Sequence, residues 1–266
     1  MRVARTYVMV VLLLILAIPV LARQTATTAQ TDPQAVTLLQ NSLAALTGGR
    51  SLSDIALTGT ARRIVGPTDE SGTATYKAIL GANRLDLTLS GGPRSEVMNS
   101  TTATPAGTWS GPDAVSHPMV LHNLTNQASI SPIFTLSALT PSQNFVVTLV
   151  GQETKSGHSV YHLSTSQRFP QMAAKTAAIE QHLTQIEIFL DVSTSLPVAL
   201  DFSTHPDNDA GLDIPVELLF SDYRSINGAQ IPFHVQKFLN NSLLLDLQFT
   251  TAQLNNGLAA SSFSVQ

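Results

Sequence analysis

The 266-residue chain contains no cysteine, so its fold cannot depend on disulfide bonds and its chemistry cannot depend on a thiol nucleophile. The absence of cysteine also excludes a lipid-modified N-terminal cysteine. Charged residues are scarce at 12%, and the 14 Lys and Arg are outnumbered by 18 Asp and Glu. Because no basic stripe occurs, we expect neither nucleic acid nor an anionic membrane surface as a partner.

The motifs of common enzymes are also missing. No G-x-S-x-G, H-E-x-x-H, phosphate-binding loop or G-x-G-x-x-G pattern occurs in the chain. The string nearest to a serine-hydrolase elbow, GTWSG at 107–111, places Ser110 one position too late. These absences favour a protein that is not an enzyme and that uses no cofactor.

Histidine and aspartate form no recognisable metal motif. His158 and His162 are four residues apart, but the alternating pattern around them indicates a strand, in which four residues span about 13 Å. Two zinc ligands bonded at about 2.1 Å cannot be that far apart. The stretch containing Asp207, Asp209 and Asp213 matches only part of a calcium loop and is typical of a turn. The sequence therefore predicts no metal site.

The N-terminus has the pattern of a secretory signal. Arg2 and Arg5 flank the start of a long apolar run, and small residues precede a cleavage point after Ala22. The alternative is an uncleaved anchor. Residues 1–22 are predicted to be a signal peptide and 23–31 a disordered linker, so we expect an exported protein, periplasmic or extracellular, without a transmembrane segment after cleavage.

Residues 32–266 are predicted to form a single, mainly β (α+β) domain. A helix begins at Asp32, a typical N-cap residue followed by proline, and ends at Gly48. A second helical pattern covers 171–183. The rest alternates with a period of two, which predicts about ten or eleven antiparallel strands joined by tight turns. The expected strands are 55–65, 72–80, 83–92, 94–99, 145–153, 159–165, 185–191, 197–204, 214–223, 230–238 and 243–250.

One segment, 100–143, departs from this alternation. It contains five prolines, the single tryptophan and two weakly helical stretches, 119–127 and 130–139. A long irregular insertion in a β domain is more often functional than decorative. We therefore interpret 100–143 as an insertion that covers the site as a lid.

The stretch FSDYRSINGAQIPFHVQKF is predicted to be a hairpin rather than a chemical site. Its turn is the strong Asn-Gly signal at Asn227. Phe220 shares a face with the preceding alternate apolar residues, and Tyr223 takes the other face. The charged and titratable side chains of the hairpin, Asp222, Arg224 and His234, are expected on the solvent side.

The same hairpin carries a resemblance to a known family. It follows the strand–turn–strand stretch 191–202, and its residues Tyr223, Arg224, Asn227, Gly228, Ile231 and Pro232 match a pattern of the outer-membrane lipoprotein-sorting, or LolA-like, superfamily. The order of an N-terminal helix followed by a β-meander is similar as well. The resemblance implies an unclosed, strongly curved half-barrel with helices on its concave side. It also implies that acyl chains or other apolar ligands bind between sheet and helices.

The resulting functional hypothesis is a non-enzymatic protein that binds a lipid or a lipoprotein acyl chain, in envelope lipid or lipoprotein trafficking. Medium-sized and large apolar residues with few aromatics suit such a cavity. The residues expected to line it are Leu87, Leu89, Trp109, Phe134, Ile186, Ile188, Phe202 and Phe220.

Two other functions remain open at this point. One is an interaction or sensor module that docks an envelope protein on an exposed sheet edge. The other is a hydrolase with a non-standard site around Asp113, His117 and His122.

Overall fold

A computed structural model describes residues 31–126, 128–139 and 144–265. The expected signal peptide, 1–22, and almost all of the expected linker lie outside these residues. Within the described part of the chain, no helix is long and apolar enough to cross a membrane.

The first helix, α1 (Pro33–Thr47), begins and ends at the residues that the sequence predicts. The Asp32 carboxylate accepts a hydrogen bond from the Gln34 backbone N–H at 2.8 Å, which satisfies one free donor of the first turn. Gly48 ends the helix with a left-handed φ of 61°. A Cβ at Gly48 would also clash with the carbonyl oxygen of Gly228, so the helix end packs directly on the Asn-Gly hairpin.

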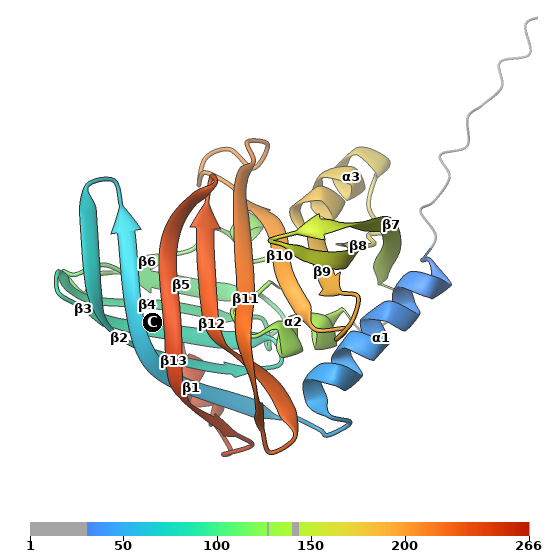
Figure 1. Cartoon of the computed structure of the whole chain (residues 1–266). Coiled ribbons are helices and arrows are strands. Elements are labelled where there is room, and N and C mark those ends of the chain that lie inside the picture. Colours follow the sequence, from blue (N-terminus) through green and yellow to red (C-terminus); the bar gives the residue numbers. More distant parts are fainter. Residues whose placement is uncertain (1–30, 127, 140–143, 266) are drawn as a thin grey trace, which may run out of the picture.

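Within the described ranges, thirteen strands form one open sheet in the order β6-β5-β4-β3-β2-β1-β13-β12-β11-β10-β9-β8-β7, and every neighbouring pair is antiparallel. The sheet is thus two meanders, β1 to β6 and β7 to β13, joined where β1 pairs with β13. It curves strongly, and the helix α2 (Pro132–Ala138) lies within the curve (Figure 1). The mainly β half-barrel expected from the sequence is confirmed.

The strands are β1 Asp54–Val65, β2 Thr68–Ile79, β3 Ala82–Leu89, β4 Gly92–Asn99, β5 Ala106–Ser110, β6 Ser116–Pro118, β7 Phe145–Lys155, β8 His158–Gln167, β9 Ile186–Asp191, β10 Pro197–Thr204, β11 Ile214–Ile226, β12 Ala229–Leu239 and β13 Ser242–Leu254.

The segment 100–143 is more regular than its composition suggests. It contributes β5 and β6, which extend the sheet and raise the strand number above the expected ten or eleven. Both strands are short and interrupted by glycine or proline, so their alternation is weak in the sequence. The segment also contains the 3-10 helix η1 (Leu121–Asn123) and α2 (Pro132–Ala138), whose residues 132–136 are buried.

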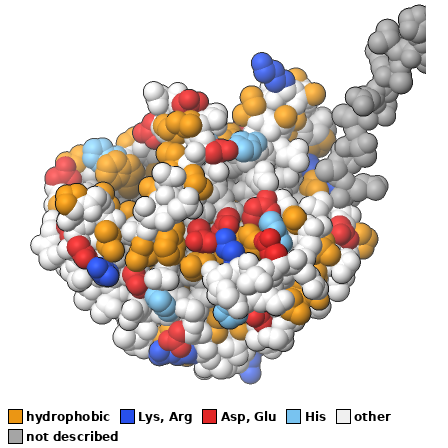
Figure 2. All heavy atoms as spheres, turned by 45° about the horizontal axis from the view of Figure 1, so that its top comes forward, with side chains coloured by type: hydrophobic (Ala, Val, Ile, Leu, Met, Phe, Trp, Pro, Cys, Tyr) orange, Lys and Arg blue, Asp and Glu red, His pale blue; other side chains and the backbone are white. Residues whose placement is uncertain are grey.

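The core lies between the concave face of the sheet and the helices α1 and α2. It contains Leu39 and Leu46 of α1, Leu136 of α2 and the inward rows of the strands in one continuous cluster. The third helix, α3 (Ala174–Leu183), contacts β8 and buries only Leu183. On the face shown in Figure 2, hydrophobic side chains are mixed with acidic ones and Lys and Arg are sparse. This distribution agrees with the acidic excess of the sequence.

The hairpin of β11 and β12 places its charges as expected. Asp222 and Arg224 form an exposed ion pair at 2.6 Å, and His234 contacts Asp246 at 2.9 Å. Tyr223 is more enclosed than a solvent-side residue, because its hydroxyl donates to the carbonyl oxygen of Pro197 at 2.8 Å and burial raises its pKa. The start of β10 therefore covers the Tyr223 side chain.

Burial of α2 leads to a prediction about stability. Leu136 is fully buried, so Leu136→Ala should leave a cavity and lower the free energy of unfolding by about 2–5 kcal/mol. Leu121→Ala, in the same segment but at a side chain that is 58% exposed, should change it by less than about 0.5 kcal/mol. Urea unfolding of both variants measures this difference. Equal and small effects would show that α2 is not part of the core.

Candidate ligand-binding cavity

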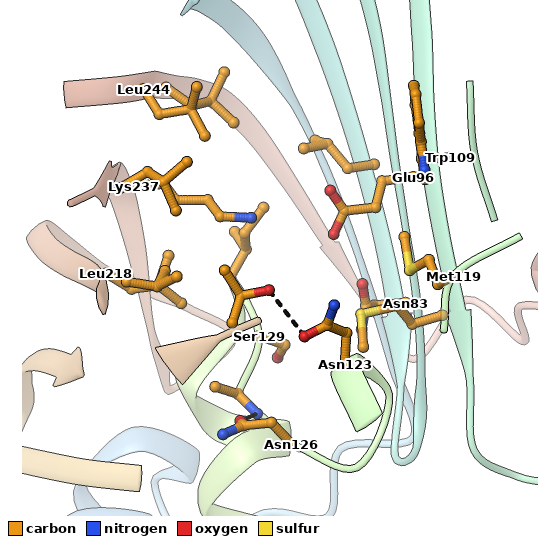
Figure 3. A pocket seen from close by; sticks show the side chains of 18 of the residues that line it. Asn83, Glu96, Trp109, Met119, Asn123, Asn126, Ser129, Leu218, Lys237 and Leu244 are labelled. Carbon is orange, nitrogen blue, oxygen red and sulfur yellow. Dashed lines mark hydrogen bonds between the residues drawn. The ribbon is translucent and has the colours of Figure 1, made fainter. Parts of the chain in front are cut away.

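A cavity of about 430 Å³ lies inside the curve of the sheet. One wall comes from β3, β4 and β5, and the facing wall comes from β10 to β13 (Figure 3). The third side comes from the chain that follows β6, through Met119, Val120, Asn123, Asn126 and residues 128–130. The volume is within the range of small-molecule sites, roughly 300–1,000 Å³.

Fourteen of the 26 lining residues are apolar, mostly aliphatic, and a β-bulge adds one of them. Between the pairs Lys237–Leu245 and Phe238–Leu243 the register of β12 and β13 shifts, so Leu244 is an extra residue in β13. As a result, the consecutive residues Leu244 and Leu245 both line the cavity. The apolar lining comprises Leu85, Leu87, Met98, Trp109, Met119, Val120, Ala128, Ile130, Phe202, Val216, Leu218, Leu239, Leu244 and Leu245.

A single ammonium group interrupts this apolar wall. Lys237 of β12 is in register with Leu218 on one side and Leu245 on the other. Its side chain points across the cavity toward that of Glu96 on β4 (Figure 3). Within the described residues neither Lys237 nor Glu96 forms an ion pair with any other side chain. The cavity therefore combines apolar residues with one cation, Lys237, and two anions, Glu96 and Asp207, that form no ion pair among the described side chains.

A cluster of three charged side chains, one carboxylate between two arginines, lies at the end of the cavity. The Glu70 carboxylate, only 7% exposed, accepts from Arg94 at 2.5 Å and lies 3.5 Å from Arg63. Both arginines line the cavity. Because Glu70 bridges them, this cluster holds the ends of β1, β2 and β4 together, and it keeps one net positive charge.

Comparison with solved structures finds this architecture in other proteins. An outer membrane lipoprotein-sorting protein domain from Vibrio parahaemolyticus matches with a TM-score of 0.55 and 13% identity, over 86% of this chain and 96% of that one. A DUF1329 family protein from Desulfovibrio piger matches with 0.56 and 12%, over 89% and 100%. A LolA superfamily protein from Nitrosomonas europaea matches with 0.53 and 12%, over 86% and 97%.

The fold is LolA-like. The resemblance that the hairpin motif suggested is thereby confirmed at the level of the fold, over most of the chain. By sequence, no protein-family model matches the chain and no curated protein matches it significantly.

The LolA-like sheet brings some of the predicted lining residues to the cavity and leaves others in the core. Leu87, Trp109 and Phe202 line the cavity. Trp109 is 47% exposed and stacks on His117, with 4.4 Å between the ring centres. The other predicted residues are buried in the core cluster away from the cavity: Leu89, Phe134, Ile186, Ile188 and Phe220.

Sequence reasoning missed the residues of the third side and the cation. Met119 and Asn123 reach the cavity because the chain after β6 folds back under the curve. They belong to the segment 100–143 that was interpreted as a lid, but no local pattern singles them out. Lys237 carried one available signal: its position in register with apolar residues of both neighbouring strands. Strand alternation alone places Leu244 outward, and only the bulge brings it inward.

The residues of the hydrolase hypothesis have separate contacts. The Asp113 carboxylate accepts from the Val115 backbone N–H at 3.2 Å. His117 stacks on Trp109, and Nε2 of His122 lies 3.1 Å from the carbonyl oxygen of Pro206. None of these contacts joins a base to a nucleophile, so the arrangement gives no support to acyl-transfer chemistry there.

Two neighbouring acids on β2 allow a matched test of the charged cluster. Glu70→Gln removes the negative partner of Arg94 in a buried setting and should lower the free energy of unfolding by about 3 kcal/mol. Asp69→Asn removes the exposed partner of Arg62, where both side chains are about half exposed, and should leave the urea midpoint almost unchanged. Equal shifts of the two midpoints would contradict the structural role given to Glu70.

Proposed function

We propose that this protein is an exported, non-enzymatic binding protein that holds an acyl chain or a comparable apolar ligand in the cavity. The observation that carries the proposal is the cavity of about 430 Å³ with apolar residues on facing walls, which the helices leave unfilled on the concave side of the sheet. Flexible aliphatic walls suit a flexible chain, and displacement of water from them drives binding.

The charges in the cavity favour an amphiphile over a purely apolar molecule. An ammonium group among leucines costs desolvation energy unless an anion lies near it. Lys237 has no ion-pair partner within the described residues, so a carboxylate or phosphate at the head of the ligand would supply one. We therefore propose an acyl-chain ligand with an anionic head group near Lys237.

The similar structures support this proposal only through the shared fold. One of them is a lipoprotein-sorting protein domain, and the present chain shares its architecture at 13% identity. A role in envelope lipid or lipoprotein trafficking is part of our proposal on this basis. The apolar cavity is the independent support.

One charged substitution tests whether the apolar wall binds the ligand. Leu244→Asp places a carboxylate in the aliphatic lining and should weaken binding of a fluorescent fatty acid at least about tenfold, because the carboxylate must lose water. Leu80→Asp, at a side chain 53% exposed in the β2–β3 turn, is the matched control. Fluorescence titration gives both affinities. Equal affinity in the two variants, or no binding by the unmodified protein, would refute the proposal.

The head-group hypothesis has its own test. Lys237→Gln should reduce affinity for a fatty acid by about tenfold, because a charged hydrogen bond of roughly 1.5 kcal/mol is lost. Affinity for the fatty alcohol of the same chain length should change little. Competition with the fluorescent probe measures both ligands. If the two ligands lose affinity equally, Lys237 contributes to packing and does not recognise the head group.

The alternative function, docking of an envelope protein on a sheet edge, has weaker structural support than ligand binding in the cavity. The edge strand β7 has a bulge at Val150, between the pairs of Leu149 and Gly151, and charged residues Glu153 and Lys155 near its end. Bulges and charges are common devices that prevent an edge strand from pairing with another chain. The edge of β7 is therefore built against strand addition.

A further inference from the structure

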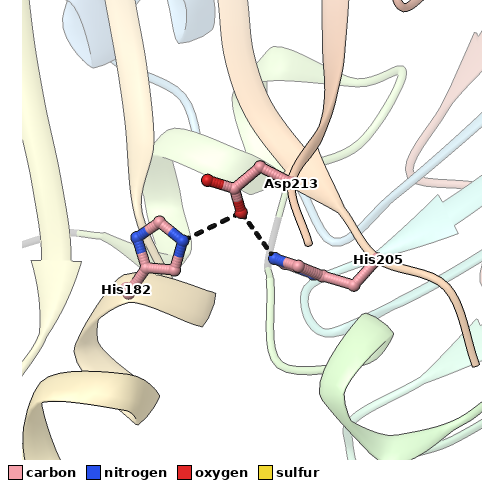
Figure 4. A group of neighbouring side chains, drawn as sticks. All are labelled: His182, His205 and Asp213. Atoms are coloured by element: carbon pink, nitrogen blue, oxygen red, sulfur yellow. Dashed lines mark hydrogen bonds and ion pairs between the residues drawn. The ribbon is translucent and has the colours of Figure 1, made fainter. Parts of the chain in front are cut away.

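Three side chains from separate parts of the chain converge outside the cavity (Figure 4). His182 lies in the last turn of α3, His205 directly follows β10, and Asp213 directly precedes β11. The Asp213 carboxylate oxygen Oδ1 lies 2.9 Å from Nε2 of His182 and 3.0 Å from Nε2 of His205. All three potential ligand atoms lie within 4.8 Å of one another.

The backbone around this group is fixed. The side chain of Asn123 clamps His205, because its amide donates to the His205 carbonyl oxygen at 2.8 Å and its oxygen accepts from the His205 N–H at 2.9 Å. The His205 side chain is 1% exposed. The end of α3 is attached to the sheet, since the Thr184 hydroxyl accepts from the Gln167 backbone N–H at 2.9 Å.

We propose that His182, His205 and Asp213 form a binding site for a divalent transition-metal ion of the zinc class. Two imidazole nitrogens and one carboxylate oxygen are ligands that such ions prefer, and three protein ligands leave the fourth tetrahedral position to water. Zinc bonds of about 2.0–2.1 Å place tetrahedral ligands about 3.3 Å apart. The observed nitrogen–oxygen distances need to open by only a few tenths of an ångström.

The setting of the three residues also provides access for an ion. His205 forms the buried wall, whereas the side chains of His182 and Asp213 are 47% and 45% exposed. The site is therefore open to solvent on the side of His182 and Asp213. A bound ion would link α3 to the connection between β10 and β11.

The affinity of this site should be moderate. Metal-binding histidines usually donate their other ring N–H to an acceptor, and removal of such a partner typically lowers affinity about 10–100-fold. Nδ1 of His205 has no hydrogen-bond partner within the described residues. We therefore expect a micromolar dissociation constant for zinc, weaker than that of closed structural sites.

The site is separate from the lipid proposal. None of the three residues lines the cavity, so zinc binding and fatty-acid binding can fail independently. His158 provides a matched control, because it pairs with Asp191 at 3.0 Å on the surface but has no second histidine at that carboxylate.

Isothermal titration of the chelator-treated protein with zinc chloride tests the proposal. We expect one ion per chain, a loss of affinity of at least about tenfold in His182→Ala and in Asp213→Asn, and no change in His158→Ala. Both test positions are exposed, so the variants should fold, and circular dichroism checks this. Cobalt should give the visible absorption of a tetrahedral site in the unmodified protein, and His182→Ala should abolish it. Absence of binding, or equal affinity in all variants, would overturn the proposal.

Discussion

The pairing of β1 with β13 is the constraint on which the architecture depends. It runs from Ile55–Leu254 to Arg63–Leu245 and joins residues about as far apart in sequence as the domain allows. At its centre the register shifts and the strands approach so closely that a Cβ at Gly59 would clash with the Gln248 carbonyl oxygen. Without this pairing the chain would form two separate meanders, each with an exposed edge.

The cavity forms because the sheet that results from joining the two meanders is curved. Because a single sheet of this length twists and curls, β3 to β5 come to face β10 to β13. The helices α1 and α2 fill one part of the enclosed space, where Leu39 and Leu136 pack. The remaining space lies near the Arg63–Glu70–Arg94 cluster and forms the cavity. The same long-range pairing therefore accounts for both the core and the unfilled space.

Local signals predicted most of the fold. Asp32 and Gly48 marked the limits of the first helix, and the Asn-Gly turn at Asn227 marked the hairpin that carries the family resemblance. These features depend on neighbouring residues, so the sequence alone is enough to identify them. The strands β5 and β6 were missed because short strands with glycine or proline show little alternation.

The site was predictable only in part, because it depends on contacts between distant segments. Alternation identifies which face of a strand is apolar, and this was enough to select Leu87 and Phe202. It cannot tell which end of that face is filled by helices, so Ile186 and Ile188 were selected although they lie in the core. The convergence of His182 with residues more than twenty positions away has no local signature either.

The central claim is that an acyl chain occupies the cavity between the two walls. Photo-crosslinking with a diazirine-labelled fatty acid, followed by peptide mass spectrometry, locates the chain directly. The account predicts crosslinks on β3–β5, on β11–β13 and on Met119, Val120 and Ile130, all suppressed by excess unlabelled fatty acid. Crosslinks confined to exposed apolar residues such as Leu80 and Ile179, or insensitive to competition, would contradict it.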